Sequence, residues 1–409
     1  MPARRHRWRP TPPSPCNNAP RLEIAPPMKV LLVANYGPDG QTSMQAFQNV
    51  LARELPAQNC EIRVIAPSPV VLRVPSTSRL WKWLGYVDKF ILFLPTLRYH
   101  ARWADVVHIV DHSNGMYVPR VPGRPTVITC HDVIAYQASI GMVPGWQVGK
   151  SGQLFQKLIF GGLAQADAIA CVSEHTRRDL RALALADAAK VRLVPMGLNA
   201  DFAPVAPDEV LRLTAPLGIA PRTRYFLHVG SDLPRKNRMA VLEAFLALQT
   251  RAADAGHSTV ADRLVFVGPE LSAPMAARAV DSGFGDRVQV IRDASHEALR
   301  ALYAGAVALI FPSLQEGFGW PVIEAQACGC PVFASDLTPM NEVGGDAAVY
   351  IDPHDPQQIA ATIEAATPRL AEMRTRGLDN ARLYAPHQMA EGYAALYREV
   401  ITARTGAHA

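Results

Sequence analysis

The chain has 409 residues, of which 49% are hydrophobic and 19% are charged, and its formal net charge is +5. This length exceeds one ordinary hydrophobic core and favours two domains. The mild positive charge is compatible with a phosphate-bearing ligand or an anionic surface. It is far below the charge of a densely basic nucleic-acid-binding protein, so it argues against that class.

The first 27 residues are basic and rich in proline, and they lack the apolar segment of a signal peptide. We interpret them as a disordered tail, or as the result of a start codon placed upstream of the true start at Met28. No apolar run approaches the roughly 20 residues that a membrane-spanning helix needs.

The six cysteines are scattered along the chain, contain no C-x-x-C motif and mostly lie in apolar runs. This pattern indicates buried thiols in a reducing compartment, with neither a zinc site nor a disulfide framework. They are Cys16, Cys60, Cys130, Cys171, Cys328 and Cys330.

From Lys29 onward, short apolar runs alternate with longer amphipathic ones. Strands that lack polar alternation and are separated by helices indicate a parallel sheet that is covered on both faces. We therefore predict an N-terminal Rossmann-like domain at 28–200, with a helix at 43–55 and strands at 29–35, 61–67, 105–111, 125–131, 167–173 and 191–195.

Residues 195–222 are rich in proline and alanine, which indicates an interdomain connection, with the linker itself at 201–222. The alternation of short apolar runs with longer amphipathic runs then begins again and predicts a second doubly wound domain at 223–383. Its strands are expected at 224–230, 263–268, 287–291, 306–311, 331–335 and 347–352, and its helices at about 238–250, 296–304, 321–328 and 356–366. Ligands bind beyond the carboxyl ends of such strands, so two facing domains predict a cleft between them.

The most informative segment is "FPSLQEGFGWPVIEAQACGCPV" at 311–332. Gly317 and Gly319 allow the backbone to approach a ligand closely, and the N-terminus of the helix that follows favours a phosphate. Glu316 and Glu324 would repel that phosphate, whereas carboxylates are strong acceptors for hydroxyl groups. Hydroxyls on both sides of a pyrophosphate are the chemistry of a nucleoside diphosphate sugar.

This segment resembles the donor-site signature, Glu-x7-Glu, of the retaining GT-B glycosyltransferases of family GT4. The stretch "HVGSDLPRKN" (228–237) resembles the phosphate loop of that family, and "NEVGGDAAVYIDPHDP" (341–356) resembles the stretch after its donor site. The resemblance spans roughly residues 29–400. It implies an α/β GT-B fold, in which two doubly wound Rossmann-like domains face a central cleft. The N-terminal domain would bind the acceptor, the C-terminal domain would bind the donor, and 384–409 would form a helix that crosses back.

The resemblance implies that Glu324 binds the ribose hydroxyls and that Glu316 lies near the hydroxyls of the donor sugar. Arg235 and Lys236 suit a pyrophosphate whose charge rises as the sugar–phosphate bond breaks. Many relatives carry Arg where this chain has Ser231, which shifts the phosphate role towards these two cations. The predicted donor site comprises Gly40, Gly230, Ser231, Arg235, Lys236, Gly268, Glu316, Gly317, Phe318, Gly319 and Glu324.

His131 ends a predicted strand and resembles the histidine that the family places against the donor sugar. The predicted catalytic residues are therefore His131, Glu316, Lys236 and Arg235. Asp132 would orient His131, and Asp111 and His112 would line the acceptor side; a structural role is the alternative for each of these three.

The first turn, "NYGPDGQTSM", lacks the G-x-G-x-x-G fingerprint, which argues against a dinucleotide cofactor. No Asp-x-Asp triplet occurs in the chain. The resemblance therefore implies a metal-independent enzyme without a cofactor, which acts on a GDP- or UDP-linked sugar by front-face transfer with retention.

Basic and aromatic residues interleave at 79–103. Two interpretations remain open: contact with an anionic membrane, or a core helix whose rings pack inside the domain. The residues concerned are Trp81, Trp83, Phe90 and Phe93 with Arg79, Lys82, Lys89, Arg98 and Arg102.

We expect a cytoplasmic hexosyltransferase, at the inner face of the membrane if 79–103 touches it, with mannose from GDP-mannose as the first candidate. The acceptor would be a sugar or lipid-linked sugar in surface polysaccharide assembly. The alternatives are a GT-B sugar-nucleotide epimerase and a catalytically degenerate sugar-nucleotide-binding subunit; a phosphorylase would need a longer chain.

Overall fold

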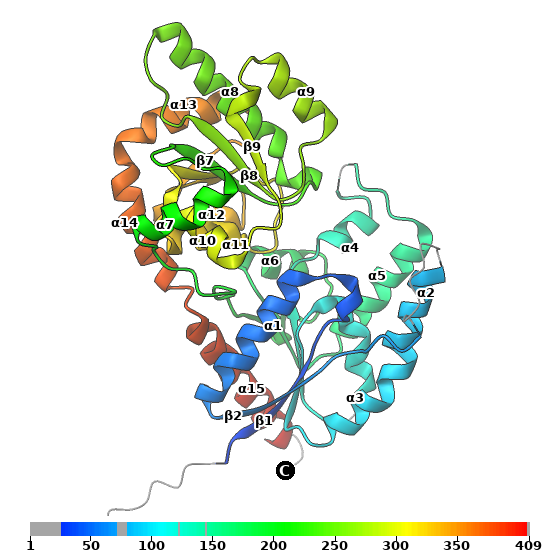
Figure 1. The fold of residues 1–409 in the computed structure, drawn as a ribbon. Coiled ribbons are helices and arrows are strands. Elements are labelled where there is room, and N and C mark those ends of the chain that lie inside the picture. Colours follow the sequence, from blue (N-terminus) through cyan, green and yellow to red (C-terminus); the bar gives the residue numbers. More distant parts are fainter. Residues whose placement is uncertain (1–25, 72–79, 122, 144, 407–409) are drawn as a thin grey trace, which may run out of the picture.

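The computed structural model describes residues 26–71, 80–121, 123–143 and 145–406, which form two α/β domains (Figure 1). Each domain contains a parallel sheet of six strands among these residues, as the apolar runs predict. The N-terminal sheet has the order β2-β1-β3-β4-β5-β6. Its strands are β1 (Met28–Val33), β2 (Cys60–Ile65), β3 (Val106–Ile109), β4 (Thr126–Cys130), β5 (Ala168–Cys171) and β6 (Val191–Leu193).

Helices cover both faces of the N-terminal sheet, which explains why its inner strands are mostly apolar and buried. The edge strands β2 and β6 carry the charged residues Glu61, Arg63 and Arg192. One face packs against α1 (Thr42–Glu54) and α15 (Pro386–Gly406). The other face packs against α3 (Phe93–Ala101), the 3-10 segment η4 (His112–Arg120), α5 (Lys150–Leu163) and α6 (Glu174–Ala182). A Cβ on Gly115 of η4 would lie 2.3 Å from the carbonyl oxygen of Ile159, so a glycine is required where η4 meets α5.

The C-terminal sheet has the order β12-β11-β10-β7-β8-β9. Its strands are β7 (Tyr225–Val229), β8 (Arg263–Val267), β9 (Val288–Ile291), β10 (Ala308–Phe311), β11 (Val332–Ser335) and β12 (Val349–Ile351). One face packs against α8 (Arg238–Ala255), α9 (Ala273–Asp281) and α13 (Pro356–Ala366). The other packs against α10 (His296–Gly305), α11 (Trp320–Ala327), α12 (Met340–Gly344) and part of α14 (Leu370–Arg382).

The connection at 195–222 contains a helix, α7 (Pro207–Thr214), that the sequence analysis did not predict. Pro207 begins this helix, and acidic residues occupy its first turn. A Cβ on Gly305 would lie 2.8 Å from Val210, so α7 packs closely on the end of α10. This part of the connection therefore belongs structurally to the C-terminal domain.

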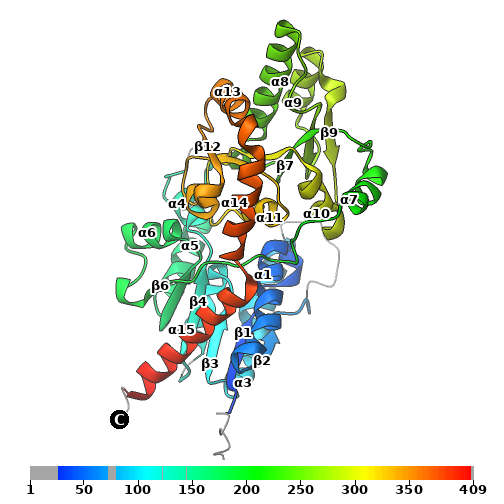
Figure 2. The same ribbon diagram turned by 90° about the vertical axis from the view of Figure 1, so that its left-hand side faces the viewer.

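The last helix, α15, leaves the C-terminal domain and runs along the N-terminal sheet (Figure 2). Buried polar groups fix it there. The hydroxyl of Tyr397 lies 2.7 Å from Nδ1 of His108, and Nε2 of His108 lies 2.8 Å from Oγ1 of Thr129, which is also 2.8 Å from the hydroxyl of Tyr393. Burial lowers the pKa of His108 to about 3, so this imidazole is neutral.

The segment that suggested membrane contact forms α2 (Leu80–Val87), the π-helical turn η3 (Asp88–Leu92) and α3. Phe93 is buried with its ring 5.4 Å from that of Tyr117, and Phe90 lies 5.9 Å from the same ring. The membrane interpretation is therefore wrong for Phe90 and Phe93, because both rings pack inside the domain. The side chains of Arg79, Trp81, Lys82 and Trp83 lie outside the described residues.

Among the described residues, no helix is long and apolar enough to cross a bilayer. The five described cysteines are free and buried, while Cys16 lies outside the described residues.

We predict that Tyr397→Phe destabilises the protein by about 1–3 kcal/mol, because it leaves one nitrogen of the buried His108 without a partner. Urea unfolding measures the change, and Tyr99→Phe is the matched control because Tyr99 is 70% exposed. Equal stability of the two variants would show that the hydroxyl of Tyr397 does not fix α15.

Candidate active site

The predicted site residues lie where the carboxyl ends of the two sheets face each other. The loop after β10 touches the loop after β4 at Gly317. A Cβ on Gly317 would lie 2.3 Å from the carbonyl oxygen of His131, and the carbonyl of Gly317 accepts a hydrogen bond of 2.8 Å from Ser173. The structure thus brings His131 of one domain directly against the glycine loop of the other.

Glu316 is a buried carboxylate that forms ion pairs with two cations. Lys236 Nζ lies 2.6 Å from its Oε1, Arg235 Nη1 lies 2.6 Å from its Oε2, and Ser313 Oγ donates a further bond of 2.6 Å to Oε1. Burial works to raise the pKa of Glu316, but Lys236 and Arg235 outweigh it and lower the pKa below its usual value. Both oxygens are therefore charged and occupied by donors.

The predicted phosphate loop is held in place by its backbone. Arg235 and Lys236 lie in the short turn η7 (Pro234–Lys236), and the carbonyl oxygen of Arg235 accepts a bond of 2.7 Å from the amide of Leu314. It also accepts the longer branch, at 3.0 Å, of the Ser313 hydroxyl bond that is shared with Glu316. The next residue, Asn237, adopts a left-handed backbone and donates to the carbonyl of Pro353 at 2.7 Å. The two cations consequently lie at a fixed distance from the glycine loop.

Two other predicted glycines support this loop. Gly268 has φ of +142°, and a Cβ there would lie 2.2 Å from the carbonyl oxygen of Gly230. Glycine is therefore required where the ends of β7 and β8 meet. Ser231, which follows Gly230, is half-buried beside them.

Glu324 is buried in α11 and has a different environment from Glu316. The hydroxyl of Tyr303 donates a bond of 3.0 Å to its Oε2, and the side chain of Asn199 also hydrogen-bonds to it. Burial raises the pKa of Glu324 to about 7, although both hydrogen bonds oppose this. Gly319, with φ of 101°, begins the helix.

The remaining member of the glycine loop, Phe318, is 4% exposed and packs edge-on against Tyr384, with 5.7 Å between the ring centroids. Its side chain therefore anchors the loop, and its backbone amide is the group left for a ligand.

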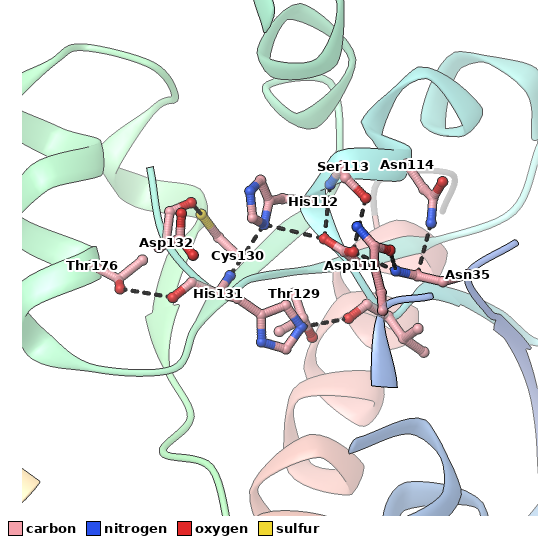
Figure 3. Close-up of polar contacts among 12 residues, drawn as sticks. Asn35, Asp111, His112, Ser113, Asn114, Thr129, Cys130, His131, Asp132 and Thr176 are labelled. Atoms are coloured by element: carbon pink, nitrogen blue, oxygen red, sulfur yellow. Dashed lines mark hydrogen bonds and ion pairs between the residues drawn. The ribbon is translucent and has the colours of Figure 1, made fainter. Parts of the chain in front are cut away.

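His131 lies beside His112 and Asp111 at the ends of β3 and β4 (Figure 3). Its Nε2 lies 2.8 Å from the carbonyl oxygen of Val110. Because a carbonyl can only accept, Nε2 holds the proton and Nδ1 is left as an acceptor. Nδ1 is buried and has no partner among the described residues, and burial lowers the pKa of the ring although Asp111 opposes it.

Asp111 is buried in a polar network with protein donors on both oxygens. Asn35 Nδ2 lies 2.5 Å from Oδ2, and the amide of Ser113 donates to Oδ1 at 2.9 Å. Burial opposes ionisation of Asp111, but His112, His131 and these bonds together lower its pKa. Asp111 is therefore built into the loop, where it fixes the start of η4.

The other predicted acceptor-side residues also have structural contacts. Asp132 accepts a bond of 2.9 Å from the amide of Ile134 at the start of α4 (Ile134–Ser139), and His112 Nδ1 lies 3.3 Å from Asp111 Oδ1. Gly40 adopts φ of 67° in the turn before α1, and Gln41 beside it contacts Asn35. Gln41, Asn35, Asp111 and His112 thus form one connected polar network.

Sequence reasoning missed several residues of the site. Asn35 lies two residues after the end of β1, and a polar residue just beyond a buried strand was a usable signal. Tyr303 and Asn199 gave no signal, because their proximity to Glu324 arises from chain segments that are distant in sequence. Ser313, three residues before Glu316, is detectable only once the loop geometry is known.

Two family models match the chain. Residues 212–382 match the model described as Glycosyl transferases group 1, and residues 49–202 match Glycosyltransferase Family 4. Together they cover most of the chain and leave out its two ends.

Among curated proteins, the chain is 29% identical over 269 residues to O-antigen chain mannosyltransferase B of Escherichia coli, covering 64% of this chain and 66% of that protein. It is 29% identical over 252 residues to D-inositol 3-phosphate glycosyltransferase of Mycolicibacterium vanbaalenii, covering 59% of this chain and 55% of the relative. The chain thus spans between half and two thirds of the length of these relatives.

Among solved structures, Anabaena Alr3699/HepE in complex with UDP and glucose superposes with a TM-score of 0.68 at 14% identity, covering 91% of this chain and 100% of that one. WaaG, a glycosyltransferase involved in lipopolysaccharide biosynthesis, superposes with a TM-score of 0.65 at 19% identity, covering 90% and 99%. These likenesses confirm the two-domain GT-B fold.

We predict that Gly317→Ala separates the two loops, because its Cβ would overlap the carbonyl oxygen of His131. Hydrogen–deuterium exchange should become faster in peptides covering 128–136 and 313–322. Gly37→Ala is the control, since nothing lies within 4 Å of a Cβ there. Unchanged exchange in both variants would contradict the contact.

A second prediction concerns Glu324, whose pKa of about 7 in the folded protein exceeds the usual 4.5. The stability linked to this raised pKa is fully present below pH 4.5 and is lost as the pH rises through 7. Relative to Glu324→Gln, the wild type should therefore lose up to about 3 kcal/mol between pH 5 and pH 8. Urea unfolding at both pH values measures this, with Glu372→Gln as an exposed control; a constant difference at both would refute the raised pKa.

Proposed function

The chain belongs to the group 1 glycosyl transferases of family GT4, and we propose that it is a retaining hexosyltransferase that uses a nucleotide diphosphate sugar. The observation that supports this proposal best is the pairing of Glu316 with Arg235 and Lys236. Glu316 precedes the start of α11, and the buried Glu324 lies within that helix. Two cations and two carboxylates in this order match the charges and hydroxyls of such a donor.

The donor would bind along the line from Glu324 to His131. Glu324 would accept the ribose hydroxyls in addition to its bonds from Tyr303 and Asn199. The pyrophosphate would lie at Arg235 and Lys236, within reach of the amides at Gly317–Gly319. Since both cations already contact Glu316, the phosphates would share them with this carboxylate.

In the proposed reaction, the bond between the sugar C1 and the phosphate oxygen breaks while a bond from C1 to the acceptor oxygen forms. The proton of the acceptor hydroxyl passes to the leaving phosphate. Arg235 and Lys236 stabilise the charge that develops there, an effect that typically contributes about 3 kcal/mol per preorganised donor. His131 positions the sugar, because its unpartnered Nδ1 is an acceptor for a sugar hydroxyl.

Within a retaining reaction, the state of Glu316 favours front-face transfer over a covalent intermediate. Its two oxygens are bound to Arg235, Lys236 and Ser313, which makes this carboxylate a poor nucleophile for a covalent intermediate. Front-face transfer needs no such nucleophile. We also propose that the two cations and the N-terminus of α11 neutralise the leaving group without a metal ion or any cofactor.

The relatives support a candidate for the donor sugar and for the acceptor. One relative is an O-antigen chain mannosyltransferase, and a structural neighbour was solved with UDP and glucose. We propose a hexose, with mannose as the first candidate, linked to GDP or UDP. The acceptor would be a sugar or lipid-linked sugar in surface polysaccharide assembly at the cytoplasmic face of the membrane.

We predict that either UDP or GDP raises the melting temperature of the purified protein and that ADP does not. Glu324→Ala should abolish this rise, because it removes the acceptor for the ribose hydroxyls. Glu372→Ala, on the exposed side of α14, should keep the rise of the wild type.

Turnover then separates the alternatives. Consumption of the sugar nucleotide that requires an added acceptor supports a transferase, whereas isomerisation without an acceptor would indicate an epimerase. Nucleotide binding without any turnover would favour a degenerate binding subunit, and a folded protein that binds no nucleotide would refute the donor site.

A further inference from the structure

One segment of the N-terminal domain combines lysines and exposed apolar residues and contains no acidic residue of its own. From Val133 to Ala166 the chain contains no Asp or Glu, but it contains Lys150 and Lys157. This stretch comprises α4, the loop after it and α5, which lies beside α2 on the side of the domain away from α1 (Figure 1).

Helix α5 carries apolar residues on its outer side as well as on its inner side. Its inner side buries Ile159, Phe160 and Leu163 against the sheet. On its outer side, Leu154 and Leu158 are 59% and 52% exposed. A surface helix normally presents a polar outer face, so these two leucines, one turn apart, require another explanation.

The lysines lie on the same outer side as the leucines. Lys150, Leu154, Lys157 and Leu158 follow the spacing i, i+4, i+7 and i+8, which places them on one face of the helix, and all four are exposed. Long lysine side chains extend their charged ends towards phosphate groups while their methylenes cover apolar surface.

The loop between α4 and α5 extends this apolar surface. Ile140, Met142 and Trp146 are 46%, 56% and 47% exposed. Ile140, Trp146 and Lys157 also border one hollow with a volume of about 790 Å³, so the loop and the helix form a continuous surface. We call Ile140, Met142, Trp146, Lys150, Leu154, Lys157 and Leu158 the α5 face.

We propose that the α5 face docks the enzyme on an anionic phospholipid membrane. Exposed leucines would enter the boundary between headgroups and acyl chains, the tryptophan would lie at the headgroup level, and the lysines would bind the lipid phosphates. The absence of acidic residues from 133–166 is the feature that favours an anionic bilayer over a protein partner, since like charges would otherwise weaken the attraction.

This inference deepens the proposed function and rests on it where it concerns the acceptor. Helix α4 begins three residues after His131 and leads directly into the exposed loop. Docking through the α5 face would therefore hold the acceptor side of the cleft close to the membrane, where a lipid-linked sugar is presented.

Cosedimentation with vesicles tests the proposal on the full chain. Wild-type protein should pellet with vesicles of equal parts phosphatidylglycerol and phosphatidylcholine, and not with pure phosphatidylcholine. Leu154→Gln/Leu158→Gln should weaken the partition coefficient by at least about tenfold. Lys150→Gln/Lys157→Gln should weaken binding at about 0.1 M salt and show a smaller dependence on salt than the wild type.

The matched control is Val280→Gln/Leu383→Gln, because these apolar residues are 73% and 66% exposed but lie in the C-terminal domain. It should bind vesicles like the wild type. Equal binding by both apolar double variants, or no binding of the wild type, would overturn the proposal. A dimer in light scattering that Leu154→Gln/Leu158→Gln dissociates, without vesicle binding, would identify the α5 face as an interface between copies instead.

Nucleotide-induced melting shifts, measured on the same samples, separate the two proposals. A protein that shows the shift but does not bind vesicles keeps its donor site and rejects membrane docking. Vesicle binding without a nucleotide shift keeps the α5 face and rejects the proposed enzyme.

Discussion

Glu316 holds a full negative charge inside the protein, and Arg235 and Lys236 make that charge tolerable. A buried ion of this kind costs several kcal/mol unless partners with good geometry surround it. The two cations must therefore remain against the loop after β10, and the bonds from Ser313 and Leu314 to the carbonyl of Arg235 keep them there. In the proposed enzyme this pre-paired cluster is the phosphate site, so its cations are already oriented before the donor arrives.

The same loop joins the two domains, and this contact needs glycine. Gly317 lies against the backbone of His131, while α15 ties the far side of the C-terminal domain to the N-terminal sheet through His108 and two tyrosines. The relative position of the domains is thus fixed at the site and also far from it. A residue from each sheet can meet across the cleft because neither connection relies on flexible side chains.

The sequence predicts all twelve described strands because both sheets are covered on both faces, which makes most of the strands short apolar runs between helices. It also locates the Glu316–Gly319 loop, since glycines and carboxylates there are adjacent in the chain. It fails for α7, where proline and alanine mask a short helix, and for Tyr303 and Asn199, which reach Glu324 only after folding. For Asp111 the sequence left a structural role open as the alternative, and the protein holds both of its oxygens with hydrogen bonds.

The two glutamates of the Glu-x7-Glu motif show how environment assigns roles to identical side chains. Cations lower the pKa of Glu316 below its usual value, while burial beside a neutral tyrosine raises that of Glu324 to about 7. Pairs of carboxyls separated in this way commonly divide the work of a site. Glu316 is held in its ionised form by the two cations, whereas ionising Glu324 is unfavourable in the protein without a ligand. In the proposed enzyme, a ligand that donates two hydroxyls to Glu324 would offset that cost.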